Sequence, residues 1–330
     1  MSRTYLYGGE QKPIDEGRSE SRADVTPFWE PTYRLMVVDK GAVQASLWLS
    51  QWFAHRLSES LDRHATEEQT TVAWVVAGSA GRGEMHLGSD QDGLLFLEES
   101  ADDTRWQAYA EAVVHILESE GFPPCNAGLM PTEAACRRTP DQWLQTVLGQ
   151  NATNRLDALR WFSVLADIHP VWGKVELVEE VRRRLLQTVA QDNAFLHDLT
   201  QHYLLHRVPL GPFGQLLTQP YGPHAGGLDL KEALYVPLVN LARLWAAAAQ
   251  IETTNTLQRI SALAQTGFWP QADAQQAAST WSAFMEWRAY QPAEATWFFP
   301  KEHSKAERLR LKEALEGIAV LQQRTSRAFR

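Results

Sequence analysis

The 330-residue sequence has only two cysteines, Cys125 and Cys136. A single pair offers no disulfide framework, and neither cysteine has a Cys or His partner at the spacing of a metal-binding motif. We therefore expect buried free thiols in a reducing compartment. The N-terminus is polar rather than a signal peptide, and no apolar run is long enough to span a bilayer. These absences predict a cytoplasmic protein with no membrane partner.

Positive charge is also scarce, because 31 Lys and Arg stand against 40 Asp and Glu and leave a formal net charge of −9. Proteins that bind nucleic acid through its phosphates normally carry an excess of positive charge. A nucleic-acid partner is therefore not expected. The chain is long enough for two domains, and its 44% of hydrophobic residues can build substantial cores.

The residues that carry chemistry are concentrated between Thr71 and Glu98. This stretch begins with a short apolar run that predicts a buried strand, and Gly78 and Ser79 follow directly. Small residues there allow backbone N–H groups to turn toward an anion. Asp90 and Asp92 then open a second apolar run, and alternate residues of an extended chain share a face. Two such carboxylates beside a phosphate-binding turn suit Mg²⁺ bound to a nucleoside triphosphate (NTP).

Residues 78–92, GSAGRGEMHLGSDQD, resemble the nucleotidyltransferase superfamily of DNA polymerase beta, whose signature is a Gly-Ser or Gly-Gly turn followed by a DxD or DxE strand. More narrowly, they resemble a bacterial nucleotidyltransferase family that is often fused to CBS and cyclic-nucleotide-binding domains. They are also similar to the uridylyltransferases that modify nitrogen-regulatory PII proteins. The resemblance to the bacterial family covers roughly residues 35–330.

This resemblance and the periodicity of the apolar residues predict the organisation of the chain. Residues 1–31 are rich in Gly, Pro and charge, and we expect a flexible arm. A polymerase beta-like α/β domain should occupy residues 32–175, with a leading helix over residues 32–64 and a small mixed sheet. Residues 122–130 resemble a segment that lines the catalytic sheet in this family, and an edge or bent strand is expected there. An all-α helical bundle should occupy residues 176–330, where the amphipathic stripes indicate helices. The resemblance implies that this bundle binds the substrate and closes over the nucleotide.

The phosphate-binding turn has expected roles of its own. Backbone amides at Gly78 and Ser79, with the Ser79 hydroxyl, should hold the β- and γ-phosphates. Arg82 should neutralise phosphate charge as a bidentate donor, or alternatively lock the loop by pairing with Glu84. Asp90 and Asp92 should bind one or two Mg²⁺ ions, with Mn²⁺ as a substitute.

Two further residues complete the expected site. Asp167 lies inside an apolar run, where an isolated charge is expensive unless it is paired or metal-bound. The resemblance implies that Asp167 is a third metal ligand or the base that activates the acceptor, and the alternative is an ion pair with an arginine such as Arg160. Lys231 should contact the triphosphate. We expect a cleft between residues 72–173 and 200–330, with all three aspartates at its floor and Lys231 facing them.

The expected reaction moves a nucleoside monophosphate from an NTP to an acceptor hydroxyl and releases pyrophosphate. Similarity to the PII-modifying enzymes favours a hydroxyl on a protein. A small-molecule acceptor is the enzymatic alternative, and a nucleotide-sensing or scaffold protein without turnover is the other.

Overall fold

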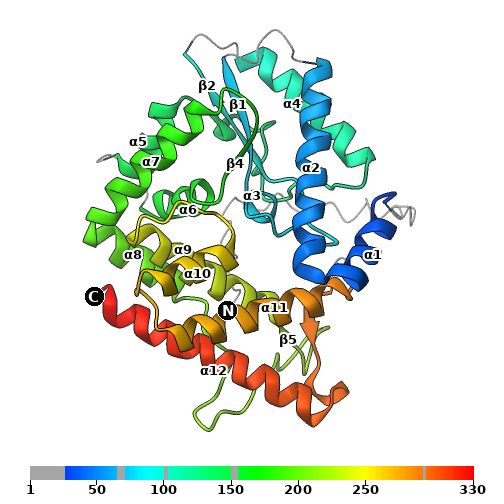
Figure 1. The fold of residues 1–330 in the computed structure, drawn as a ribbon, viewed down its shortest axis with the longest axis vertical. Coiled ribbons are helices and arrows are strands. Elements are labelled where there is room, and N and C mark those ends of the chain that lie inside the picture. Colours follow the sequence, from blue (N-terminus) through cyan, green and yellow to red (C-terminus); the bar gives the residue numbers. More distant parts are fainter. Residues whose placement is uncertain (1–26, 65–70, 100–102, 150–154, 293–294) are drawn as a thin grey trace.

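The computed structural model describes residues 27–64, 71–99, 103–149, 155–292 and 295–330. A small sheet flanked by helices precedes a region built almost entirely of helices (Figure 1). We call these regions the sheet half, up to Gln191, and the helical half, from residue 192 onward. The predicted fold class is thereby confirmed. Most of the predicted N-terminal arm, residues 1–26, lies outside the described residues.

The sheet has four strands in the order β3-β2-β1-β4. Strand β1 (Val72–Val76) runs antiparallel to both β2 (Gly93–Leu97) and β4 (His169–Gly173), and the short β3 (Arg137–Arg138) runs parallel to β2. The sheet is therefore mixed, as predicted.

Both faces of the central strands are buried, which explains their continuously apolar sequences. Val72, Trp74 and Val76 of β1 point into one hydrophobic core. Ala73 and Val75, which alternate with them, point into a second core on the opposite face. Each core includes side chains from both halves of the chain. The domain boundary expected at residue 175 stays a prediction.

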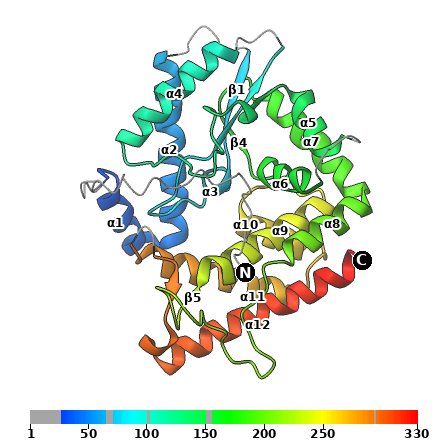
Figure 2. The same cartoon turned by 180° about the vertical axis from the view of Figure 1, so that it is seen from behind.

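Helices cover both faces of the sheet (Figure 2). On one side lie α1 (Glu30–Lys40), α2 (Ala42–His64) and α4 (Asp103–Ser119), and on the other lie α5 (Pro140–Leu148), α6 (Arg155–Leu165) and α7 (Glu176–Gln191). The helix expected over residues 32–64 is divided at Gly41, whose φ of +85° ends the first segment. The bent strand expected over residues 122–130 is reduced to one bridge between Gln91 and Pro124.

The helical half contains α8 (Asn193–Tyr203), α9 (Val236–Ala248), α10 (Thr256–Gln265), α11 (Gln271–Ala289) and α12 (Lys305–Ala328). Helix α9 is central and buried along most of its length. A π-helical turn, Lys231–Tyr235, leads into it, and a two-residue ladder joins β5 (Leu228–Asp229) to β6 (Trp297–Phe298). None of the described helices combines the length and apolar character needed to cross a membrane.

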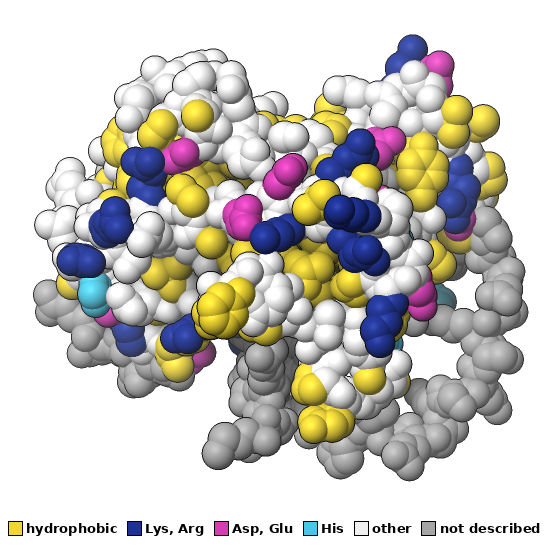
Figure 3. All heavy atoms as spheres, turned by 90° about the horizontal axis from the view of Figure 1, so that it is seen from below, with side chains coloured by type: hydrophobic (Ala, Val, Ile, Leu, Met, Phe, Trp, Pro, Cys, Tyr) yellow, Lys and Arg dark blue, Asp and Glu magenta, His cyan; other side chains and the backbone are white. Residues whose placement is uncertain are grey.

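Helix α12 packs one stripe, which includes Leu311, Leu315, Ile318 and Leu321, into the core, as its sequence predicts. Leu309 and Val320 are exposed on the same helix. On the face seen from below, Lys and Arg side chains lie among acidic and hydrophobic ones (Figure 3).

A buried ion network joins the two halves at Asp167, which is 1% exposed. Its carboxylate accepts hydrogen bonds from Arg82 Nη1 at 2.6 Å, Arg243 Nη2 at 2.5 Å and Arg259 Nη1 at 2.7 Å. Burial alone would raise the pKa of Asp167, but these arginines, Arg243 first, hold it well below its ordinary value. The carboxylate is therefore ionised, and both of its oxygens accept hydrogen bonds from arginines.

This arrangement corrects the expected position of Asp167. Among the described residues, Asp167 does not belong to the group of possible metal donors that contains Asp90 and Asp92. The structure instead shows the alternative, an arginine-paired carboxylate, although the partners are distant in sequence and do not include Arg160. The reason is desolvation: a carboxylate this deeply buried needs charge compensation in place.

Replacing Asp167 by Asn should lower the free energy of unfolding by about 3–5 kcal/mol, because the buried guanidinium groups lose their counter-charge. Urea denaturation followed by circular dichroism measures the change. Asp198→Asn is the matched control, since Asp198 pairs with Arg155 at 2.8 Å on the exposed surface, where such pairs contribute about 0–1 kcal/mol. An Asp167→Asn protein as stable as this control would contradict the structural role.

Candidate functional site

The turn predicted to bind phosphate is the short helical segment α3 (Gly78–Gly81), which we call the phosphate turn and which follows β1 after the single residue Ala77. Gly78 adopts a φ of +55°, a conformation that favours glycine. A Cβ atom at this position would lie 2.2 Å from Oδ2 of Asp92. Glycine is therefore required twice, for the backbone conformation and for the close approach of the carboxylate. The turn predicted to bind phosphate and one predicted metal ligand are direct neighbours.

Asp90 and Asp92 lie immediately before β2. The residue between them, Gln91, turns into the protein and donates its side-chain amide to Val114 O at 3.1 Å and Phe122 O at 2.7 Å. Because the side chain of Gln91 points into the protein, those of Asp90 and Asp92 point to the opposite side of the chain. We call these two residues the acidic pair. Ligand atoms of Asp90 and Asp92 lie within 4.8 Å of each other, so the structure brings these two predicted residues together.

A sulfur atom completes this group, because Cys125 Sγ also lies within 4.8 Å of a ligand atom of each aspartate. We call Asp90, Asp92 and Cys125 the donor cluster. Sequence reasoning assigned Cys125 only as a free thiol, since no motif spacing links it to the aspartates. One sequence feature could have identified Cys125: it lies in residues 122–130, which resemble a family segment that lines the catalytic sheet. Pairing of Gln91 with Pro123 and Pro124 brings that segment to the acidic pair.

The electrostatics of the donor cluster favour a cation. Burial, followed by repulsion from Asp90, raises the pKa of Asp92 from 3.8 to about 7. Burial and the same two carboxylates raise the pKa of the Cys125 thiol above its ordinary value. Burial is the largest cause of both pKa shifts and repulsion between negative groups is the next, so the protein does not fully compensate the negative charge here. A bound divalent cation would supply that compensation, so the donor set fits a metal ion.

The guanidinium group of Arg82 is held by other side chains and is not oriented to bind phosphate. Its Nε donates to Glu84 at 2.7 Å, its Nη1 to Asp167 at 2.6 Å and its Nη2 to the Tyr235 hydroxyl at 2.5 Å. The side chain is only 6% exposed. The geometry matches the alternative considered from the sequence, in which Arg82 locks the loop through Glu84.

Lys231 is exposed at the start of the π-helical turn, where Asp229 Oδ1 accepts a hydrogen bond from its backbone N–H at 3.0 Å. The positive charge of Lys231 is a minor influence that opposes the raised pKa of Asp92 and adds to the lowered pKa of His86. Burial is the largest influence on His86, and with Arg288 and other cations it lowers that pKa to about 3. The charge of Lys231 therefore acts on the acidic pair. His86, which is neutral, is a residue near the site that the sequence analysis did not identify.

Ser79 lies on the phosphate turn and is half-buried. Its hydroxyl is 3.3 Å from that of Ser89, which itself accepts a hydrogen bond from the backbone of His86 at 3.0 Å. The loop between the turn and the acidic pair is therefore tied back to the turn. Ser79, Asp90 and Asp92 belong to one continuous segment, while Asp167 faces a different set of side chains.

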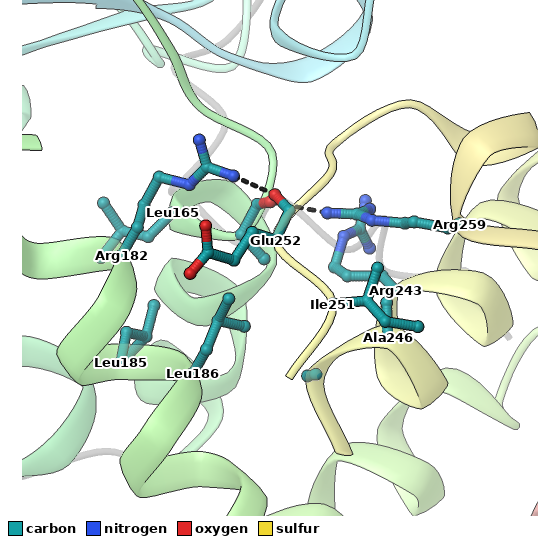
Figure 4. Close-up of a pocket in the computed structure, with 11 residues that line it drawn as sticks. Leu165, Arg182, Leu185, Leu186, Arg243, Ala246, Ile251, Glu252 and Arg259 are labelled. Atoms are coloured by element: carbon teal, nitrogen blue, oxygen red, sulfur yellow. Dashed lines mark hydrogen bonds between the residues drawn. The ribbon is translucent and has the colours of Figure 1, made fainter. Parts of the chain in front are cut away.

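A separate cavity borders the ion network and lies between α7, α9 and the segment that follows α9 (Figure 4). Arg182, Arg243 and Arg259 line it together with Leu165, Ile251 and Glu252. Its volume of about 10 Å³ has room for one water-sized molecule. This cavity is too small for a nucleotide and does not include the acidic pair.

Comparison with known proteins agrees with this geometry. Residues 43–155 match the family described as "Putative nucleotidyltransferase DUF294", and residues 193–329 match the "Putative nucleotidyltransferase substrate binding domain". A relative, the bifunctional uridylyltransferase/uridylyl-removing enzyme of Methylococcus capsulatus (strain ATCC 33009 / NCIMB 11132 / Bath), is 32% identical over 127 residues. That match covers 38% of this chain and 14% of the relative's length.

The two family matches follow one another in the expected order and together cover 250 of the 330 residues. The first contains the phosphate turn and the whole donor cluster, and the second contains Lys231 and two arginines of the ion network. The chain therefore belongs to the family that these two models describe, and it matches both of the family's regions in order.

Proposed function

We propose that this protein transfers a nucleoside monophosphate from an NTP to an acceptor hydroxyl and releases pyrophosphate, with Mg²⁺ as the cofactor. The observation that carries the proposal is the contact between Gly78 and Asp92. It brings the turn expected to bind phosphate beside two carboxylates whose ligand atoms lie within 4.8 Å of each other. Family membership supports the same reaction class.

The phosphates would bind at the turn. The first N–H groups of a helical turn have no partner within it, so those of Gly78 and Ser79 can bind phosphate oxygens. The Ser79 hydroxyl would donate as well if it turned away from Ser89, to which it donates at 3.3 Å in this structure. Lys231 would add a compensating charge from the helical half. Arg82 would contribute by holding the turn, because its guanidinium group is engaged with Glu84, Asp167 and Tyr235.

Asp90 and Asp92 would hold the Mg²⁺ ion through hard oxygen donors, which this cation prefers. When bound, the ion would neutralise the charge that develops on the transferred phosphoryl group and on the leaving pyrophosphate. We propose no metal-binding role for Asp167, whose carboxylate has three arginine partners. The activation of the acceptor is consequently assigned to the carboxylates of the acidic pair.

Replacing Asp90 or Asp92 by Asn should abolish Mg²⁺-dependent NTP binding and turnover. The thermal midpoint of the metal-free protein should stay unchanged or rise, because one of two repelling carboxylates is removed. Calorimetric titration with ATP, GTP, CTP and UTP in MgCl₂ measures binding, and differential scanning calorimetry measures stability. Asp141→Asn is the control, since Asp141 is an exposed carboxylate. Undiminished NTP binding by both variants would refute the assignment.

Replacing Cys125 by Ser should shift the metal preference of the site toward Mg²⁺. Thiolate sulfur favours softer ions, whereas a hydroxyl oxygen is a harder donor. The ratio of Mn²⁺-supported to Mg²⁺-supported NTP binding should therefore fall several-fold in Cys125→Ser. Cys136→Ser is the matched control, because Cys136 lies outside the donor cluster. An equal ratio in both variants would show that the sulfur contacts no metal.

For the acceptor, we propose a protein hydroxyl. The support is the similarity to an enzyme named as a uridylyltransferase, although this chain spans only a small part of it. Incubation with each α-³²P-labelled NTP, Mg²⁺ and clarified lysate should produce a labelled protein band that is absent with Asp92→Asn. Label found in small solutes alone would replace this proposal with a small-molecule acceptor. No transfer at all, despite NTP binding, would indicate a nucleotide sensor.

A further inference from the structure

The phosphate turn is held from the opposite half of the protein by residues 252–256, which we call the linker. They comprise the last part of the connection between α9 and α10 and the first residue of α10, Thr256. The Thr254 hydroxyl donates to Gly81 O at 2.8 Å. The Asn255 side-chain amide donates to Arg82 O at 2.9 Å. Both acceptors are backbone carbonyls at the end of the phosphate turn.

A third bond reaches the turn through Glu84. The backbone N–H of Thr256 donates to Glu84 Oε1 at 2.7 Å, while Glu84 Oε2 accepts from Arg82 Nε at the same distance. The backbone N–H of Glu84 in turn donates to Ser79 O at 2.8 Å. Three successive residues of the linker therefore bind the turn or its immediate support.

The linker is itself anchored on its other side. Arg182 donates to the carbonyl of Glu252, and Arg259 Nε donates to Thr253 O at 2.8 Å (Figure 4 shows Arg182, Glu252 and Arg259). Asn255 Oδ1 caps α10 by accepting from Gln258 N at 3.1 Å. Because it is fixed at both sides, the linker can hold the turn in one conformation rather than follow it.

The turn needs such support. Gly78 has a positive φ, and a Cβ atom at Gly81 would lie 2.0 Å from the Asp167 carbonyl, so the backbone passes through a narrow space at both ends of the turn. Small residues here leave the backbone conformationally free in the absence of external contacts. An amide must point accurately to bind a phosphate oxygen, and misplacement by about 1 Å loses much of that binding.

We propose that Thr254 and Asn255 are positioning residues: they fix the phosphate turn from the helical half, so that nucleotide affinity in the sheet half depends on the linker. This proposal rests on the proposed function of the turn. Neither residue is assigned a contact with substrate. Their effect reaches the nucleotide only through the backbone of Gly81 and Arg82.

The test is NTP affinity measured by calorimetry in MgCl₂, with whichever of ATP, GTP, CTP and UTP binds the wild-type protein most tightly. Thr254→Val keeps the shape of the side chain and removes the donor, and it should weaken affinity about twofold to thirteenfold, the range for one hydrogen bond of about 0.5–1.5 kcal/mol. Thr254→Ser, which restores the hydroxyl, should recover affinity. Thr253→Val is the control, because the Thr253 hydroxyl bonds Gln258 and not the turn.

A second variant distinguishes a loss of affinity from a loss of folding. Asn255→Ser retains a side chain that can cap α10 but removes the amide donor to Arg82 O, so affinity should fall while the unfolding midpoint changes little. Wild-type affinity in both Thr254→Val and Asn255→Ser would overturn the positioning role and leave the proposed function intact. A wild-type protein that binds none of the four NTPs would instead overturn the proposed function itself.

Discussion

The carboxylate of Asp167 and the three guanidinium groups around it hold the two halves of this protein together. Arg82 reaches it from the end of the phosphate turn, whereas Arg243 and Arg259 reach it from α9 and α10. Charges this deeply buried are tolerated only when each has a partner and the remaining hydrogen bonds are made. Movement of one half away from the other would expose these charges unpaired. The network therefore favours a single relative placement of the sheet and the helical half.

Two aspartate environments in the same protein, one buried and one partly exposed, have opposite electrostatic consequences. Asp167 is surrounded by arginines that hold its pKa low, and it is complete as a structural anion. Asp92 faces another carboxylate and a thiol, and its pKa is raised to about 7. Only the second environment gains from an added cation. Contacts formed in the fold thus separate a structural carboxylate from a candidate metal ligand.

The parts of the site that lie close together in sequence could be predicted. The apolar run of β1, the glycine and serine after it, and the acidic pair before β2 are local patterns, and the structure places them together as expected. Local patterns predicted the bounds of helices and strands less well where the backbone conformation of a single residue interrupts the element. Gly41 divides a helix that the apolar periodicity alone would continue, because its positive φ is incompatible with a helix. The segment around Cys125 pairs through one bridge instead of forming a strand.

The sequence by itself determined the fold class, the position of the glycine turn after β1 and the proximity of Asp90 and Asp92, because strand alternation and a two-residue carboxylate spacing depend only on neighbouring residues. Tertiary structure decided what Asp167, Arg82 and Cys125 do. The arginines that neutralise Asp167 lie more than 70 positions away in sequence, and Cys125 lies more than 30 positions from the aspartates it approaches. Whether a buried charge is paired within the protein or remains available for a ligand depends on which distant side chains the fold brings to it. That is a property of packing, which no local pattern encodes.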